Sequence, residues 1–336
     1  MKIGLSAIAL FLSVAAIGET AVASGLRGEY GFISSAVLYP QPEAEARARV
    51  AVMAREYGIR EFMIYDWFAD YSTPVRGAVW KDAFFRSHEI SRETIRVTVD
   101  EIHRQGGRAW AYVQAVGAEE DNLEDPAAGI WRMRTGDGAA SWHPTDRAPR
   151  FPVYFPNDAW AKIMVSRWAP AIRELGFDGI HWDTLGPIAG DPSAEAAGIH
   201  AFLRTAHNLL AAYELRQTMN FVELHWWDPA LIRATCEFPY AEIWFTGTER
   251  RYYDAMADPA LGGARGVMAM YPKADRPAGW SDTDLLLARA KEARKNNLVY
   301  VAIGDGERRL KHEYWPDTAP MNEAERAFFR VFAKSD

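Results

Sequence analysis

The sequence predicts one α/β domain, a (β/α)8 TIM barrel, and three observations support this fold class. Short apolar segments alternate with amphipathic segments along almost all of the 336 residues. Apolar strands of this kind are buried on both faces, as in parallel sheets covered by helices. Eight such units in roughly 300 residues fit a closed barrel better than an open sheet. In addition, no GxGxxG motif follows any predicted strand, which weakens the dinucleotide-binding alternative.

Each element is predicted from its local pattern. The expected strands are short apolar runs, and they span residues 32–38, 61–66, 109–115, 179–183, 218–224, 241–245, 266–271 and 298–303. The expected helices are amphipathic and span residues 42–57, 91–105, 159–175, 194–213, 229–236, 251–257, 282–296 and 322–333. A Pro- and Gly-rich excursion over 119–158 follows the third strand, where a substrate-shaping loop is expected. No linker rich in Ser, Gly or Pro divides residues 24–336, so we expect one domain there.

Composition narrows the function classes. A hydrophobic fraction of 49% with 25% charged residues excludes wholesale disorder. The net charge of −7 argues against nucleic acid as a partner. The single cysteine, Cys236, excludes a disulfide framework and a CxxC metal site, and we expect neither a metal nor a cofactor. The thirteen tryptophans are typical of proteins that stack flat ligand faces.

The first residues have the pattern of a secretory signal peptide. Lys2 precedes an apolar run over 3–17, and Ala21-Val22-Ala23 provides a cleavage site before Ser24. We therefore expect cleavage after Ala23 and a secreted or periplasmic protein, with an uncut N-terminal anchor as the alternative. No later stretch is long and apolar enough to span a bilayer, so none is expected in the mature protein.

Carboxylates and aromatic residues gather where the predicted strands end. In a barrel of this kind the reactive groups stand at the C-terminal ends of the strands, so these side chains should share one rim. Indole rings pack on sugar C–H faces, while carboxylates and amides bind hydroxyls, so we expect a polysaccharide or oligosaccharide substrate. The residues expected to bind it are Asp66, Trp67, Tyr112, Gln114, His181, Asn220, Glu223, Trp244, Asp305 and Glu307.

Asp183 and Glu242 are the expected catalytic pair on that rim, because two carboxyl groups flanking a glycosidic bond can cleave it. An Asp at a strand end is often only a turn or cap residue, so the position of Asp183 taken alone is compatible with either a catalytic or a structural role. Glu242 lies inside an apolar strand, where an unpaired carboxylate is costly, and this favours a functional role. His181 is expected to be a hydrogen-bonding wall of the pocket, since no HxH or HExxH spacing accompanies it.

Four segments appear in chain order: YDW at 65–67, GFDGIHWDTLG at 176–186, YAEIW at 240–244, and GDGERRLKHEYWP at 304–316. They resemble the motifs of glycoside hydrolase family 66, the dextranases and cycloisomaltooligosaccharide glucanotransferases. The resemblance implies that Asp183 is the nucleophile of a retaining hydrolase and Glu242 its acid/base. It also implies that Asp66 lines the −1 subsite, an ion pair with Arg76 being the alternative. The implied substrate is an α-1,6-glucan such as dextran, cleaved internally.

The sequence also departs from the family pattern. We recognise neither the immunoglobulin-like domain that usually precedes the barrel nor the β-sandwich that follows it. The second strand continues as WFAD at 67–70, without the basic pair expected of dextranases. Two other readings therefore stay open: a polygalactosaminidase-like hydrolase of another barrel family, and a non-catalytic glycan-binding barrel of the cell envelope.

Overall fold

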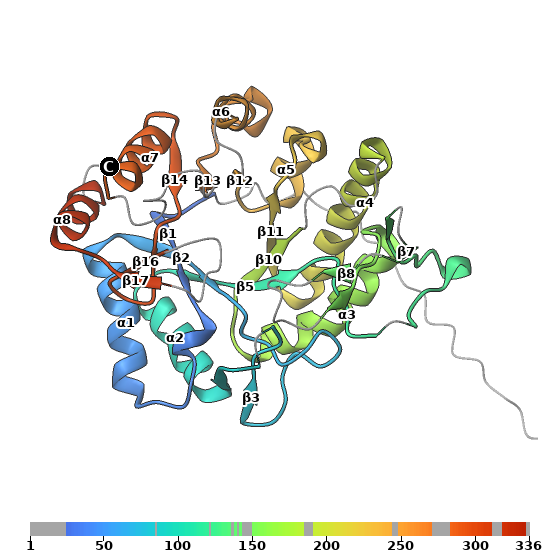
Figure 1. The fold of residues 1–336 in the computed structure, drawn as a ribbon, viewed down its shortest axis with the longest axis horizontal. Coiled ribbons are helices and arrows are strands. Elements are labelled where there is room, and N and C mark those ends of the chain that lie inside the picture. The colour runs from blue at the N-terminus through green and yellow to red at the C-terminus, as the bar shows by residue number, and fades with distance from the viewer. Residues whose placement is uncertain are drawn as a thin grey trace, which may run out of the picture.

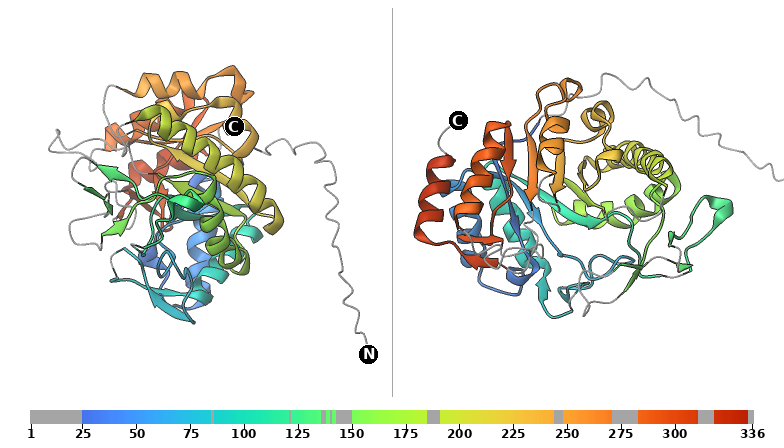
Figure 2. Two further views of the ribbon diagram at one scale, coloured as in Figure 1. Left: turned by 90° about the vertical axis from the view of Figure 1, so that its right-hand side faces the viewer. Right: turned by 45° about the horizontal axis from the view of Figure 1, so that its top comes forward.

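The computed structural model describes residues 25–84, 86–120, 122–135, 138–139, 141–142, 150–184, 191–243, 248–270, 283–310 and 318–333. The predicted signal peptide and Trp244 lie outside these residues. Within them, parallel strands curl into a barrel that helices surround, as Figure 1 and the two further views in Figure 2 show. The predicted fold class is confirmed.

The barrel strands follow each other around the sheet in chain order. They are β1 (Glu29–Ile33), β2 (Ile59–Ile64), β5 (Arg108–Gln114), β10 (Gly179–Asp183), β11 (Arg216–Phe221), β12 (Tyr240–Ile243), β13 (Gly266–Met270), β14 (Leu298–Tyr300) and β15 (Ile303–Gly304). β14 and β15 together form the eighth strand of the barrel. β14 pairs with β13, while Gly304 in β15 pairs with Phe32 in β1, so the segment 298–304 closes the barrel.

The helices alternate with these strands and cover the outside of the barrel (Figure 1). They are α1 (Glu43–Glu56), α2 (Arg92–Arg104), α3 (Asp158–Glu174), α4 (Pro192–Leu210), α5 (Pro229–Thr235), α6 (Glu249–Met256), α7 (Thr283–Lys295) and α8 (Glu323–Phe332). Several begin at side-chain caps that satisfy the first backbone N–H groups. Ser91 caps α2, Asn157 caps α3, and Asn322 and Glu325 form a capping box at α8.

Shorter elements extend the connections. The β2–α2 connection contains the hairpin β3 (Val79–Lys81) and β4 (Glu89–Ser91). The excursion after β5 contains two small hairpins, β6 (Arg134–Thr135) with β7 (Gly138–Ala139), and β8 (Ser141–Trp142) with β9 (Phe151–Pro152). Figure 1 shows this excursion projecting beyond α3 and α4. After β15, the chain adds the antiparallel strands β16 (Arg308–Leu310) and β17 (Thr318–Pro320).

The expected first strand, 32–38, is misplaced. The strand runs from Glu29 to Ile33, and residues 35–37 form a 3-10 helix. The chain leaves the sheet at Ser34 because the Ser34 backbone N–H and hydroxyl both donate to the Asp305 carboxylate, each at 2.8 Å. This contact, across the seam of the barrel, could not be expected from the apolar pattern alone.

A buried ion network closes the N-terminal end of the barrel. Arg108 donates to Glu61 at 2.6 Å, to Glu237 at 2.5 Å and to the carbonyl of Gly25 at 2.7 Å. All three charged side chains are buried. Because an unpaired charge in this position would be costly, the network holds the first described residues against the start of β2 and β5.

The tryptophans serve largely as core residues. Indole rings fill the core both inside the barrel and between the sheet and the helices, and five of them are fully enclosed: Trp67, Trp110, Trp160, Trp168 and Trp182. The high aromatic content, which suggested ligand stacking, is therefore in large part a packing feature. In the part of the chain that the structure describes, no helix has the length and apolar character needed to cross a membrane.

Candidate active site

Asp183 and Glu242 are joined by a single amide. Asp183 is the last residue of β10, Glu242 lies in β12, and Asn220 stands on β11 between them. The Asn220 Nδ2 group donates to Asp183 Oδ1 at 2.8 Å and to Glu242 Oε2 at 2.6 Å. The two accepting oxygens can therefore be no farther apart than 2.8 Å plus 2.6 Å, which is about 5.4 Å.

The Asp183 carboxyl is held by a second donor. The Tyr112 hydroxyl on β5 donates to Asp183 Oδ2 at 2.8 Å, so each carboxyl oxygen accepts a hydrogen bond. Burial raises the pKa of Asp183 to about 6, and the hydrogen bonds from Tyr112, Asn220 and the backbone of Thr184 limit that rise. Asp183 is thus a positioned carboxylate that ionises near neutral pH.

His181 lies inside the barrel, one layer below Asp183. Its Nδ1 is 3.1 Å from the Tyr30 hydroxyl, and its ring packs edge-on against Tyr240 with ring centroids 4.6 Å apart. Burial lowers the pKa of His181 to about 3, so the imidazole is neutral at ordinary pH. With 2% of its surface exposed, it supports the floor of the site, and a substrate-binding role stays a prediction.

Asp66 is a buried carboxyl just beyond the end of β2. Its backbone adopts a left-handed conformation with φ of 54°, and its side chain has no exposed surface. Neither carboxyl oxygen has a hydrogen-bond partner among the described residues. Burial, with the nearby negative charges of Asp82 and Asp183, raises the pKa of Asp66 well above its ordinary value. Arg76, the alternative partner considered above, pairs with Asp70 at 2.5 Å.

Trp67 points away from the rim. Its indole Nε1 donates to the backbone carbonyl of Tyr112 at 3.1 Å, and its ring packs against Trp168 on α3 and against Phe177. The left-handed backbone at Asp66 turns the next side chain into the layer between sheet and helices. The indole has no exposed face on which a sugar could stack in this structure.

Asp305 and Glu307 both make structural contacts. Asp305 lies where the first and last barrel strands meet, and Glu307 bonds to residues of the helical layer and its loops. Asp305 accepts both Ser34 donors at the junction of the first and last strands, and burial raises its pKa. Glu307 accepts hydrogen bonds from the Tyr57 hydroxyl at 2.6 Å and from Arg330 on α8 at 3.0 Å. These contacts give both carboxylates structural partners, and neither belongs to the cluster around Asn220.

The remaining predicted ligands are Gln114, the last residue of β5, and Glu223, in the connection after β11. The Gln114 Oε1 accepts from the backbone of Val116 and Gly117, each at 2.8 Å, while its Nε2 has no partner among the described residues. Glu223 is half-buried and lies 3.9 Å from the His225 ring. Both side chains therefore keep hydrogen-bonding capacity that a substrate hydroxyl can use.

Tyr71 is a polar residue that the strand-end reasoning did not find. Its hydroxyl is buried without a partner among the described residues and lies close against Gly117, where an added Cβ would stand 2.9 Å from that oxygen. The charges of Asp66, Glu119 and Asp183 all act on it. It was missed because it lies several residues beyond the strand end, where neither periodicity nor strand position marks it.

A charged pocket of about 320 Å³ lies near Asp66 and Tyr71. Asp82, which lines it, is also the residue whose charge acts most strongly on Asp66. The lining residues come from the β2–α2 connection and the loop after β5: Ala69, Asp70, Ser72, Arg76, Trp80, Lys81, Asp82, Arg86 and Glu119.

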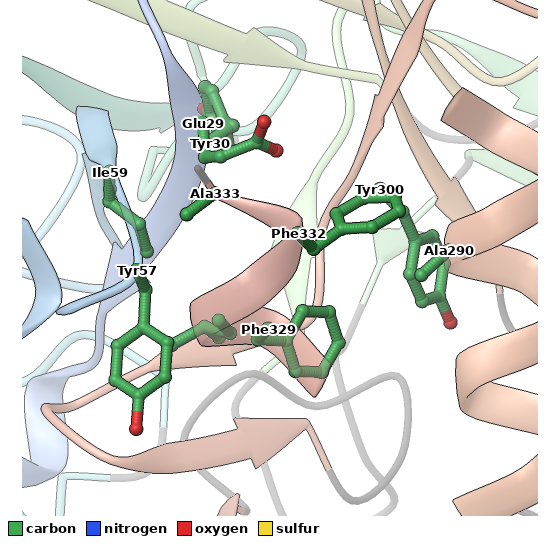
Figure 3. A pocket seen from close by; sticks show the side chains of 10 residues that line it. Glu29, Tyr30, Tyr57, Ile59, Ala290, Tyr300, Phe329, Phe332 and Ala333 are labelled. Carbon is green, nitrogen blue, oxygen red and sulfur yellow. The ribbon is translucent and has the colours of Figure 1, made fainter. Parts of the chain in front are cut away.

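A second pocket lies between β1, α7 and α8, and Figure 3 shows its lining side chains. Tyr57, Tyr300 and Phe329 are among them, and its volume is about 10 Å³, which is room for about one water molecule. It is a packing gap.

Among the described residues, no group of three or more His, Cys, Asp or Glu side chains is arranged to hold a metal ion.

Paired carboxylates at the C-terminal ends of barrel strands define the class of glycoside-cleaving barrels. The chain belongs to glycosyl hydrolase family 66, whose model matches residues 28–325.

Among curated relatives, a cycloisomaltooligosaccharide glucanotransferase from Niallia circulans is 27% identical over 238 residues, covering 64% of this chain and 24% of the relative. The chain thus spans about a quarter of the length of the curated relatives it matches.

Solved structures share the barrel. A Paenibacillus cycloisomaltooligosaccharide glucanotransferase, complexed with cycloisomaltoheptaose, superposes with a TM-score of 0.60 at 24% identity, covering 73% of this chain and 38% of that one. A maltogenic α-amylase from Thermotoga neapolitana has a TM-score of 0.53 at 15% identity, covering 92% of this chain and 77% of that one. At these identities the likeness establishes the fold.

Proposed function

We propose that this protein is a secreted, retaining glycoside hydrolase that cleaves α-1,6-glucans such as dextran at internal linkages. The observation that carries the proposal is the Asn220 amide, which holds two carboxyl oxygens, Asp183 Oδ1 and Glu242 Oε2, no more than about 5.4 Å apart. Retaining enzymes keep their two carboxyl groups about 5–5.5 Å apart, whereas inverting enzymes need about 6.5–9.5 Å to admit a water between them.

In the first step of this reaction Asp183 attacks the anomeric carbon and forms an ester bond to the sugar. The bond to the glycosidic oxygen breaks, and Glu242 gives its proton to that oxygen, which leaves as an alcohol. In the second step Glu242 takes a proton from water, and the resulting hydroxide attacks the same carbon and releases Asp183. A sugar hydroxyl in place of water would give transglycosylation by the same route.

Buried polar atoms near the pair support a hydroxyl-rich substrate. The Asn220 Oδ1 offers an acceptor, the Gln114 Nε2 offers a donor, and the Asp66 carboxyl and the Tyr71 hydroxyl offer both, all without partners among the described residues. Such groups are normally satisfied by ligand or ordered water. Sugar hydroxyls donate and accept, so they match this mixed set. The choice of an α-1,6-glucan is supported by family membership and by the names of the relatives.

The test is incubation of the mature protein with a panel of glucans and galactosaminoglycans. We expect dextran to be cut, with product anomers of retained configuration by NMR and a fall in viscosity that outpaces the release of reducing ends. Cleavage of galactosaminoglycan instead, or glycan binding without turnover, would select one of the two other readings. N-terminal sequencing of the exported protein tests cleavage after Ala23.

Two variants test the roles. Asp183→Asn should abolish turnover on every substrate, because no nucleophile remains. Glu242→Gln should abolish turnover of the polymer yet keep the first step on an aryl glycoside, whose leaving group needs no proton. Full activity of both variants on polymer would refute the assignment.

A further inference from the structure

Asn220 is placed by the barrel to reach both of its neighbouring strands. It stands on β11, where the adjacent Met219 is in register with Trp182 on β10, and where Asn220 itself is in register with Tyr240 on β12. Its backbone carbonyl accepts a hydrogen bond from the Thr184 hydroxyl at 2.9 Å. The residue is buried, with 3% of its surface exposed. Its amide is therefore held in one place by the strand and by its contacts.

We propose that Asn220 is a positioning residue that holds the catalytic pair together and stabilises negative charge on either member, by donating one N–H to each carboxyl. A primary amide has two N–H donors, and here each has one acceptor, Asp183 Oδ1 and Glu242 Oε2. The kinetic consequences of this inference rest on the proposed retaining reaction. The arrangement of the three side chains does not depend on it.

The reaction moves one negative charge from one side of this amide to the other. Before the first step Asp183 is ionised and Glu242 carries a proton. After it Asp183 is a neutral ester and Glu242 is a carboxylate. The charge facing Asn220 is the same in both states, and one of its two fixed N–H groups already points at each position. Donors that need no reorganisation as charge moves are the kind that lower a barrier most effectively.

This role differs from direct substrate binding, the role expected for Asn220 from the sequence. Both of its N–H groups are engaged by the carboxyl groups, which leaves only Oδ1 without a partner among the described residues. A residue that only bound substrate would change KM when removed. A residue that only supported the fold would change stability. A donor to both carboxyl groups must also change the pH at which each one ionises, because a hydrogen bond to a carboxylate favours its charged form.

Other titratable groups lie close enough to the pair to interact with its charge. The charges of Asp183 and Glu242 act on groups in the segment after β2 and on β5, β12 and α6: Tyr65, Asp66, Tyr71, Tyr112, Tyr240 and Tyr252. These groups are present in both the wild type and an Asn220 variant. Any difference between the pH dependences of the two proteins therefore arises from the Asn220 amide.

The first measurement compares pH profiles of kcat/KM for Asn220→Ala and Tyr112→Phe, after thermal melting shows that both are folded. The acidic limb requires ionised Asp183, and the basic limb requires protonated Glu242. Asn220→Ala should lower kcat by about 10²–10³-fold and move both limbs to higher pH. Tyr112→Phe removes a donor to Asp183 alone, so it should move the acidic limb and leave the basic limb in place. An Asn220→Ala variant with a raised KM and unmoved limbs would overturn the inference.

The second measurement needs no activity. The side-chain amide signal of Asn220, assigned by its loss in Asn220→Ala, is followed by NMR over pH in the free protein. We expect two titration steps in the wild type and one in Glu242→Gln, where only Asp183 still ionises. Two steps in a protein that cleaves no glycan would leave this inference standing and refute the proposed function. One step or none in the wild type would overturn the inference, whatever the activity.

Discussion

Asp66→Asn should stabilise the folded protein at neutral pH. Asp66 is buried, and its carboxyl oxygens have no partner among the described residues. Its pKa is raised in the folded protein by burial and by the charges of Asp82 and Asp183. A carboxyl with a raised folded-state pKa weakens folding progressively as the pH rises above the unfolded value of about 3.9, because the unfolded chain then releases a proton that the folded protein retains.

The size of the effect has an upper bound. If Asp66 keeps its proton in the folded protein up to pH 7, the cost there is about 4 kcal/mol, since each pH unit above the unfolded pKa contributes about 1.36 kcal/mol. Asn has the same shape, carries no charge and tolerates the left-handed backbone at φ 54°. Asp66→Asn should therefore gain up to about 4 kcal/mol at pH 7, and close to nothing at about pH 4.

Urea unfolding at a series of pH values measures this difference. Asp70→Asn is the matched control in the same loop, because Asp70 pairs with Arg76 and accepts from the backbone of Ser72 and Thr73. It should lose stability at pH 7, opposite in sign to Asp66→Asn. A destabilised Asp66→Asn at pH 7 would show that the carboxyl is ionised and paired, and a difference that does not change with pH would show that folding does not raise its pKa. Either result would refute the reasoning. If Asp66 also binds sugar, kcat/KM of the same preparation should fall by roughly ten- to a hundredfold.

Two further predictions concern stability. Arg108→Ala should lower the free energy of unfolding by about 3–5 kcal/mol in urea, because two buried glutamates lose the cation they share. The exposed helical pair of Lys162 is the control, and an equal loss in Lys162→Ala would contradict the reasoning. The hydrogen bond to Asp178 raises the pKa of His103, so the stability it adds is complete below about pH 6.5 and is lost as pH rises through the raised value. His103→Gln should thus be less stable than the wild type at acidic pH and equal to it at alkaline pH, as thermal melts at both will show.

Local pattern was enough for the elements and for the fold class. Strand and helix periodicities depend on neighbours in the chain, so the predicted helices over 91–105 and 159–175 agree with α2 and α3 to within about a residue. Counting the units then indicated a barrel, and a barrel places strand ends on one rim. That rule predicts that Asp183 and Glu242 lie on the same rim. In the structure both accept a hydrogen bond from the side-chain amide of Asn220.

The tertiary structure decided what each strand-end side chain does. Trp67 and Glu307 stand near strand ends as predicted, yet a left-handed backbone at Asp66 and the turn after β15 direct them into the core and toward α8. Asn220 gains its partners because the strand order of the sheet places β11 between β10 and β12, the strands that carry the two carboxylates. Side-chain direction and cross-strand partners depend on backbone dihedrals and on register between distant segments. Periodicity along one chain carries neither quantity, so they appear only once the barrel is closed.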